Sequence, residues 1–456
     1  MAGSPSSLDR PPSRVRLRAL GPFVSHPTTH PSASLRHGLF PRLASAYTVN
    51  ELGNWLGDVA LAVLVYDATA SALATAALFI AARLVPSLLA PVVVARVEGS
   101  HRRGAVAGLY AIEAIIFAAL AVVAAVRFSL PAILVLAAVD GTLALSGRAL
   151  VRAAVVSELG AGDQLRRGNA VLNGGLTVSA AVGPAVAGLL VSGAGVSAAL
   201  VLDAASFAAA AVVLVGVVTP GPQPTSPLLA RVREALAHVR ADGRLTGLLG
   251  AEALALVWFA AVIPVEVVFA KGTLHAGSSG YGALLASWGV GMIGGAVLFA
   301  WARRWALGRL LAWSTLAIAV AYGGVSVAPS LTVACGASVV GGVGNGVQWV
   351  SLVSAVQALG PPALLPRLMA LVESIGAAAP VVGFVAGGVL ASAFSARSAY
   401  AVAGLAAGLA AGVFAVLARA GTFEAGGLDG REGDNDASAP EAPVAPVAPA
   451  RTPASP

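Results

Sequence analysis

The chain has 456 residues and a net charge of +7, with 57% hydrophobic residues, 11% charged residues and a mean hydropathy of +0.85. About a quarter of the residues in an ordinary soluble domain are charged, so this composition excludes a soluble globular protein and indicates an integral membrane protein. The basic residues are scattered between apolar runs and do not form a patch with interleaved aromatic residues, which argues against nucleic-acid binding.

The first 38 residues are rich in Pro, Ser and Arg and include a single acid, Asp9. They lack the apolar core that a signal peptide needs. A transit peptide has a similar composition, but a disordered cytoplasmic tail is the simpler interpretation of residues 1–38.

Twelve apolar stretches follow, each of a length that suits a helix crossing the roughly 30 Å hydrocarbon layer of a bilayer. We predict membrane spans at 43–65, 71–95, 104–126, 130–151, 169–193, 195–217, 245–269, 280–301, 308–328, 331–357, 368–392 and 397–418. A Pro-rich break from Thr219 to Pro227 separates the sixth span from the seventh. The basic sequence RVREALAHVR (231–240) then predicts an amphipathic helix on the cytoplasmic face.

These features predict an all-α integral membrane protein with twelve transmembrane helices in two six-helix bundles. The N-terminal bundle covers 39–218, a cytoplasmic linker with the amphipathic helix covers 219–243, and the C-terminal bundle covers 244–419. Residues 420–456 are rich in Gly, Asp, Pro and Ala, and we expect them to form a disordered cytoplasmic tail.

The distribution of basic residues supports this topology, because cytoplasmic loops of membrane proteins carry an excess of Lys and Arg. With the N-terminus inside, only Arg127, Lys271 and Arg397 among the 28 basic residues fall outside, and Arg83 falls within a span. A missed span in either half would scramble this alternation. Lys271 is the only lysine, which is typical of a GC-rich bacterial gene. We therefore expect a multi-pass protein of a bacterial plasma membrane with both termini in the cytoplasm.

Small residues and one proline allow a neighbouring helix to approach the fifth span closely and allow its backbone to bend. These residues are Gly174, Gly175, Gly183, Pro184 and Gly188. At a constant offset of 200 residues the eleventh span repeats this pattern with Gly383 and Gly388, and Gly387 lies beside them. Arg167 and Arg367 match at the same offset. This match favours an internal duplication, which is typical of secondary transporters.

Three stretches carry a resemblance to a known family: GNWLGDVALAVLVYDATAS at 53–71, ARLVPSLLAPVVV at 82–94 and VRAAVVSELGAGDQLRRGNAVLN at 151–173. They are similar to the drug and siderophore efflux branch of the major facilitator superfamily, which includes macrolide and enterobactin exporters. The likeness covers roughly residues 40–418. It implies two six-helix bundles, inward termini and transport by alternating access.

Two motifs of that superfamily are only partly present. The loop after the second span normally resembles G-x-L-A-D-R-x-x-R-R, whereas here Glu98 replaces the Asp and the final Arg102 and Arg103 are kept. This erosion puts the usual charge-relay gate in doubt. The antiporter motif of the fifth span is partly kept as Gly183, Pro184 and Gly188, and this resemblance implies export rather than import.

Ionisable side chains are costly inside a bilayer, so each one within a span is a candidate for substrate binding or proton coupling. Glu51, Asn54 and Asp58 share one face of the first span. The full set of candidates is Glu51, Asn54, Asp58, Arg83, Glu113, Asp140, Asp203, Glu252, Glu266 and Glu373. A structural role in holding helices together is the alternative for each. Arg83 in particular needs a nearby acid, either Asp58 or Glu113.

A second group of charged residues lies near the cytoplasmic helix ends and forms a candidate gate: Glu98, Arg102, Arg103, Arg148, Arg152, Glu158, Arg167 and Arg367. Snorkelling to the membrane surface is the alternative for the arginines. Trp258, Phe259, Trp288 and Trp349 are candidates to line a cavity for an amphiphile, with packing or interface roles as the alternative.

Sequence signatures of enzymes are missing. The chain contains no Walker loop, no HExxH pattern and no GxSxG elbow, and Cys335 is the only cysteine. An intramolecular disulfide and a cysteine-based metal cluster are therefore excluded. We expect no enzyme activity, no metal and no cofactor.

We therefore expect a monomeric secondary transporter that exports an amphiphilic small molecule of the drug, macrolide or siderophore type. Its expected partners are that substrate, protons as the coupling ion and the lipid bilayer. Two bundles would rock about a midplane cavity in alternating access. The alternatives are an importer or facilitator of a small metabolite, a non-transporting membrane receptor, and an enzyme with its site between the helices.

Overall fold

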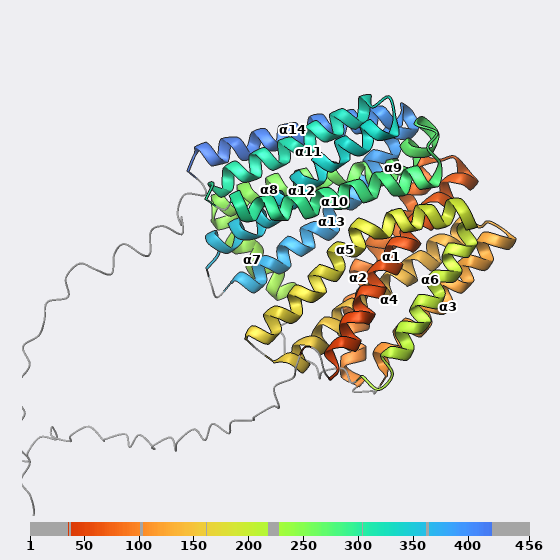
Figure 1. The fold of residues 1–456 in the computed structure, drawn as a ribbon. Coiled ribbons are helices and arrows are strands. Elements are labelled where there is room, and N and C mark those ends of the chain that lie inside the picture. Colours follow the sequence, from red (N-terminus) through yellow and green to blue (C-terminus); the bar gives the residue numbers. More distant parts are fainter. Residues whose placement is uncertain are drawn as a thin grey trace, which may run out of the picture.

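The computed structural model describes residue 35 and residues 38–100, 104–160, 162–217, 228–302, 304–361 and 364–421, and within these ranges every regular element is a helix (Figure 1). The predicted tails fall mainly outside the described residues, and so does the Pro-rich break at 219–227. The expectations of disorder and of a linker break therefore concern parts of the chain that the structure does not describe.

Six long helices form the first half, which we call the N-terminal bundle. They are α1 (Phe40–Thr69), α2 (Ala72–Ser100), α3 (Ala105–Val126), α4 (Leu130–Leu159), α5 (Asp163–Ala194) and α6 (Val196–Val213). Each helix corresponds to one of the first six predicted spans, although α6 ends at Val213 rather than at residue 217. α5 runs as one helix through Pro184. The short α7 (Leu228–Ala241) follows and contains the predicted amphipathic sequence.

The second half, the C-terminal bundle, begins with a helix that is interrupted. Its elements are α8 (Gly243–Ala261), α9 (Ile263–Val268), the π-helical turn η1 (Phe269–Thr273), α10 (Gly277–Ala302), α11 (Leu307–Val327), α12 (Leu331–Leu359), α13 (Leu365–Ala393) and α14 (Ala396–Arg419). The seventh predicted span is thus α8, α9 and η1 in succession. The break at Val262 precedes Pro264, which cannot donate a backbone hydrogen bond to the preceding turn.

Eleven helical segments of the described chain are long and apolar enough to cross a membrane, and they correspond to the second to twelfth predicted spans. The remaining predicted span is α1, which has 30 residues and so a length of about 45 Å at 1.5 Å per residue. α1 packs against α4, α5 and α6 within the N-terminal bundle, and its polar residues Asn50 and Glu51 are buried there. The predicted fold class, an all-helical membrane protein, is confirmed.

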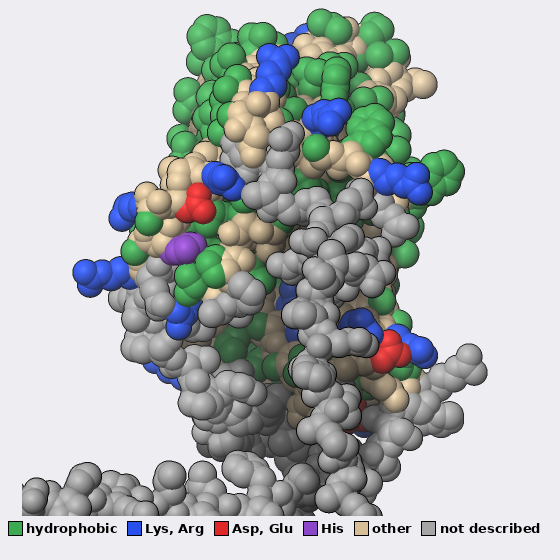
Figure 2. Space-filling model, turned by 90° about the vertical axis from the view of Figure 1, so that its left-hand side faces the viewer, with side chains coloured by type: hydrophobic (Ala, Val, Ile, Leu, Met, Phe, Trp, Pro, Cys, Tyr) green, Lys and Arg blue, Asp and Glu red, His purple; other side chains and the backbone are tan. Residues whose placement is uncertain are grey.

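Basic side chains gather at the end of the molecule where α7 lies, which we call the α7 end (Figure 2). Helices that start or stop there carry Arg166, Arg309 and Arg419, and Arg304 lies in the turn between α10 and α11. The opposite end carries Lys271 in η1, and we call it the Lys271 end. The two ends differ in charge as the sequence pattern predicts for the two faces of a membrane protein.

The two bundles meet along two helix pairs: α5 packs against α10, and α2 packs against α13. Gly188 of α5 lies against the backbone of α10, where an added Cβ would be 3.0 Å from the Cα of Gly282. Gly388 of α13 lies against α2, where an added Cβ would be 2.8 Å from the Cβ of Ala76. Two glycines that are 200 residues apart therefore serve the same purpose in the two contacts between the bundles.

A second matched pair lies within the bundles. Gly183 of α5 faces the side chain of Trp55 in α1, and Gly383 of α13 faces the backbone of α8 near Val257. Since α1 and α8 begin the two halves, the 200-residue offset relates equivalent contacts. Gly387 also packs closely on α8, at Ala261. The structure thus supports the internal duplication with packing as well as with sequence.

The close contacts on α5 predict unequal effects of adding a methyl group. At Gly188 an alanine Cβ would lie 2.7 Å from the backbone oxygen of Ser278, so we expect Gly188→Ala to lower the free energy of unfolding by about 1–3 kcal/mol. Gly174 has open space around it, so Gly174→Ala is the matched control and should be neutral or stabilising by up to about 1 kcal/mol. Thermal unfolding of the purified variants measures both. Equal midpoints for the two variants would contradict the packing described.

Candidate functional site

A cavity of about 320 Å³, the central cavity, lies between the two bundles and is lined by both. The N-terminal bundle contributes residues from α1, α2 and α5, and the C-terminal bundle contributes residues from α8 to α12. The wall is mostly apolar and aromatic, and its charged residues are Asp58, Arg83 and Glu266. A concave, mainly apolar pocket with a few polar groups has the character of a small-molecule site.

Asp58 and Arg83 form an ion pair at the edge of this cavity. One terminal guanidinium nitrogen of Arg83 lies 2.5 Å from Oδ2 of Asp58, and the two side chains keep 53% and 26% of their surface exposed. The pair joins α2 to α1. Of the two acids that the sequence offers as partners for Arg83, Asp58 is the one in contact, and Glu113 lies on α3.

Three aromatic side chains form a pre-arranged wall on the C-terminal side of the central cavity. Trp288 stacks on Tyr322 with 5.6 Å between ring centroids, and Phe259 tilts against both rings at 5.5 and 6.4 Å. The indole nitrogen of Trp288 donates a hydrogen bond to Oδ1 of Asn345 at 3.4 Å. These contacts hold the rings in place without a ligand. Phe259 and Trp288 therefore have both of the roles considered from the sequence, since they line a cavity and also pack against their neighbours.

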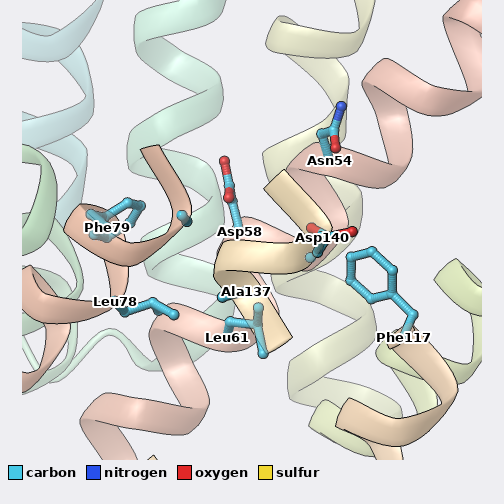
Figure 3. A pocket seen from close by; sticks show the side chains of 10 residues that line it. Asn54, Asp58, Leu61, Leu78, Phe79, Phe117, Ala137 and Asp140 are labelled. Atoms are coloured by element: carbon cyan, nitrogen blue, oxygen red, sulfur yellow. The ribbon is translucent and has the colours of Figure 1, made fainter. Parts of the chain in front are cut away.

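A second cavity, of about 20 Å³, lies inside the N-terminal bundle and shares Asp58 with the central cavity. Figure 3 shows Asn54 and Asp58 of α1 and Asp140 of α4 around it. The amide of Asn54 donates to Oδ1 of Asn50 at 3.1 Å, whereas Oδ1 of Asp140 is buried without a hydrogen-bond partner among the described residues. Roughly 10–15 Å³ suffices for one water molecule, so this cavity has room to connect the two carboxyls.

Two more acids of the same bundle, Glu113 of α3 and Asp203 of α6, are fully buried. Among the described residues, neither carboxyl oxygen of Glu113 has a hydrogen-bond partner, and Asp203 accepts one bond at Oδ1 from the hydroxyl of Ser206 at 3.2 Å. Asp203 packs against α1 at Gly53, where a side chain would collide with its carboxyl group. The N-terminal bundle therefore holds an inner group of acids, Glu113, Asp140 and Asp203, and none of them forms an ion pair with a described cation.

Glu51 pairs instead with Arg148 of α4. Oε1 of Glu51 lies 2.8 Å from Nε of Arg148, and the two side chains are 3% and 32% exposed, so the contact is a largely buried ion pair. One turn further along α4, Arg152 donates to the hydroxyl of Tyr47 at 2.6 Å and to Oδ1 of Asn173 at 3.4 Å. These contacts join α4 to α1 and α5 near the α7 end.

The two remaining acids of the C-terminal bundle lie in different surroundings. Glu252 of α8 is buried and accepts a hydrogen bond at Oε2 from the amide of Gln348 in α12 at 3.2 Å. It lines a small cavity that shares Phe259 and Asn345 with the central one. Glu373 of α13, by contrast, has an exposed side chain and lines none of these cavities.

The gate candidates do not form one cluster within the described residues. Glu158 accepts a hydrogen bond from the backbone of Leu39 at 3.2 Å and so holds the start of α1. Arg167 pairs with Asp163 on the same exposed turn of α5, at 2.8 Å. Arg367 lies in the first turn of α13. Arg102 and Arg103 lie outside the described residues, as does the side chain of Glu98.

One ion pair that the sequence did not predict joins the bundles at the Lys271 end. Nζ of Lys271 in η1 lies 2.7 Å from Oδ1 of Asp67 in α1, and it donates to the hydroxyl of Ser278 at 3.2 Å. Gly272 brings η1 against the hydroxyl of Tyr66. The signal that could have found this contact is that Lys271 is the only lysine and lies outside the cytoplasmic loops. Nothing in the sequence indicates its partner.

Comparison with known families places most of the chain in one of them. Residues 29–438 match the family described as a transmembrane secretion effector, within the major facilitator superfamily. A comparison with curated protein sequences found no match.

Solved structures share the fold at low sequence identity. The nucleoside transporter NupG has a TM-score of 0.67 and 13% identity, with 84% of this chain and 100% of that chain covered. A bacterial homologue of the iron transporter ferroportin, in an inward-facing state, has a TM-score of 0.62 and 18% identity, with 82% and 97% covered. A bacterial homologue of the lysosomal transporter Spinster, also inward-facing and unoccupied, has a TM-score of 0.60 and 15% identity, with 85% and 96% covered. Likeness at this level concerns the fold alone.

The buried pair of Glu51 and Arg148 predicts a strong coupling in stability. Removing one charge leaves the other buried and unpaired, so we expect Glu51→Gln to lower the free energy of unfolding by up to about 3 kcal/mol. The double variant Glu51→Gln/Arg148→Gln should recover most of that loss, because neither charge then lacks a partner. Thermal unfolding of the single and double variants measures the coupling. Additive losses would contradict the pairing.

Proposed function

Because the chain belongs to the transmembrane secretion effector family of the major facilitator superfamily, we propose that it exports an amphiphilic small molecule in exchange for protons. The observation that carries this proposal is the position of Asp58. Its carboxylate lines the central cavity between the bundles and also the small cavity that leads to Asp140. A substrate and a proton can therefore act on the same side chain from two sides.

The substrate part of the proposal rests on the wall of the central cavity. Aromatic and aliphatic side chains make up most of it, and a few polar groups lie among them. Such a wall suits a ligand with a large apolar surface and one polar or charged group. A small, fully polar metabolite would leave much of the apolar wall without a partner.

The proton part rests on the inner group of acids, Glu113, Asp140 and Asp203. A carboxylate buried without a cation or a set of donors is costly, and a proton removes that cost. Asp140 is the member that lines the small cavity with Asp58, so it is the first acceptor for a proton that comes from the central cavity. Glu113 and Asp203 are further storage sites, and Glu51 and Glu252 are secondary candidates because each has a partner.

The distribution of contacts between the bundles supports alternating access. The Lys271 end is closed by Asp67 and Lys271 and by the contact of Gly188 with α10. Toward the α7 end α5 and α10 separate, and Gly174 of α5 meets no neighbouring atom within 4 Å (Figure 1). With the basic α7 end in the cytoplasm, as the positive-inside rule favours, this is an inward-facing arrangement with both termini cytoplasmic.

We further propose that the halves 39–218 and 244–419 move as two units, joined by the linker 219–243. Export requires the cavity to open at the Lys271 end. Among the described residues, the pair of Asp67 and Lys271 is the one ion pair that joins the bundles there, and breaking it is a small energetic cost. The pair is partly exposed, with Asp67 50% accessible. Protons entering from outside would then reach Asp58 and Asp140 through the central cavity.

The proton-coupled step predicts that Asp140 is required for coupling export to the proton gradient and is not required for folding. We expect Asp140→Asn to slow the export of fluorescent amphiphiles from cells by about tenfold or more, because the neutral amide cannot exchange a proton. The wild-type protein should lose export when a protonophore dissipates the proton gradient. Asp163→Asn, a change at the exposed start of α5, is the control with unaltered export.

These outcomes also separate the alternatives. Export that survives both the protonophore and Asp140→Asn would contradict proton antiport. Accumulation of the amphiphile inside the cells, instead of its loss, would indicate import. A panel that contains neutral and cationic amphiphiles keeps this test independent of the charge of the substrate.

Alternating access predicts that fixing the Lys271 end stops transport. In a Cys335→Ala background, the variant Asp67→Cys/Lys271→Cys places the only two cysteines on α1 and η1. We expect a short bismaleimide to join them and to abolish export, whereas each single cysteine variant treated in the same way should keep it. Undiminished export by the crosslinked protein would contradict opening at this end.

A further inference from the structure

Among the described residues, the central cavity is lined by one more acidic side chain than basic side chains. Its charged residues are Asp58, Arg83 and Glu266, and the first two neutralise one another in an ion pair. Glu266 of α9 is partly exposed to the cavity. Among the described residues no Lys or Arg lies within ion-pair distance of it, and no side chain donates a hydrogen bond to it.

The fold holds this carboxyl group in place. Glu266 lies in the short helix α9. This helix follows the break at Val262, and Pro264 is in its first turn. The neighbouring Val265 and Val267 are fully buried, so they anchor the two sides of the helix and leave Glu266 facing the cavity. The carboxyl group is therefore presented by a rigid element rather than by a loop.

Aromatic side chains line the same cavity as this carboxyl group. Phe259, Trp288 and Tyr322 form the aromatic wall, and Tyr281 of α10 and Trp55 of α1 also line the cavity. The faces of such rings attract cations, and the attraction grows when water is excluded. An anion would be repelled by the same ring faces and would gain no counter-charge from the carboxyl group of Glu266.

Among the described residues, Arg83 is the one cation that lines this cavity, and its charge is balanced by Asp58. One guanidinium nitrogen lies 2.5 Å from Oδ2 of Asp58, so an anionic ligand would gain less from Arg83 than from an unpaired arginine. Lys271 is similarly held by Asp67 and Ser278 at the end of the molecule. The charges on the cavity wall thus discriminate against anions.

We propose that the central cavity binds an organic cation, with Glu266 as its counter-ion and the aromatic wall around its apolar body. The ligand class is a molecule with one protonated amine, quaternary ammonium or phosphonium centre and several apolar groups. This inference rests on the proposed function, because it assigns a substrate class to the cavity of the proposed exporter. It does not depend on proton coupling.

The test is binding to the purified full-length protein in detergent, without any gradient. Tetraphenylphosphonium and tetraphenylborate have nearly the same shape and opposite charges, so they form a matched pair of probes. Quenching of tryptophan fluorescence reports binding, because Trp55 and Trp288 line the cavity, and equilibrium dialysis gives the affinity. We expect the cation to bind at least about tenfold more tightly than the anion.

Variants locate the charge that is responsible. Glu266→Gln should weaken phosphonium binding by about tenfold and should leave borate binding unchanged or tighter. Glu266→Asp should keep the preference for the cation, and Asp163→Asn, on the exposed turn of α5, should change neither affinity. Thermal unfolding of each variant shows that a lost affinity is not a lost fold.

Three results would overturn the proposal: equal affinities for the two ions, tighter binding of the borate, or an unchanged phosphonium affinity in Glu266→Gln. None of them would bear on proton-driven export, which is measured in cells with neutral and cationic amphiphiles. Conversely, a protein that binds the phosphonium through Glu266 but exports nothing would contradict the proposed function and keep the cation site.

Discussion

The cost of placing charged groups inside a bilayer is the constraint on which this structure depends. Each ionisable side chain within the helices needs a counter-charge, a hydrogen-bonding partner or a proton. Glu51 uses Arg148 as its counter-charge, and Glu252 uses the amide of Gln348. Glu113 has neither within the described residues. The N-terminal bundle therefore contains both charge pairs that join its helices and acids that are stable when they carry a proton.

Asp58 connects these two kinds of site. Its ion pair with Arg83 joins α1 to α2, and its side chain lines the central cavity on one side and the small cavity with Asp140 on the other. An ion pair at such a place is easily disturbed, because a change of charge in either cavity alters its electrostatic balance. Through this arrangement, occupation of the central cavity can make protonation of Asp140 more or less favourable, and protonation of Asp140 can do the same for occupation of the cavity.

The contacts between the bundles set how the cavity opens. Gly188 and Gly388 allow α5 to approach α10 and α13 to approach α2 so closely that their backbones are in contact or nearly so. Close packing of this kind favours a motion in which rigid helices pivot, and it disfavours a motion in which the helices deform. The same contacts recur in both halves, so the cavity lies between two similar units, as in transporters built from repeats.

The sequence could predict what hydrophobicity and length control, namely an all-helical membrane fold and the order of its spans. It could also predict the repeat, since Gly183 and Gly383 have equivalent positions. It could not predict the rotation of each helix, because helices that are apolar on all sides carry little periodic signal. For that reason the exposed side chain of Glu373, the cavity position of Glu266 and the pairing of Lys271 with Asp67 became apparent only in the structure.

The most direct measurement of the central claim is the movement of protons in liposomes that contain the purified protein and an internal pH indicator. A gradient of amphiphile is imposed from outside to inside, with no initial difference in pH. Antiport predicts that protons leave as the amphiphile enters, so the lumen becomes alkaline, and that Asp140→Asn abolishes the change. Amphiphile entry at the wild-type rate with no change in the lumenal pH would contradict proton coupling.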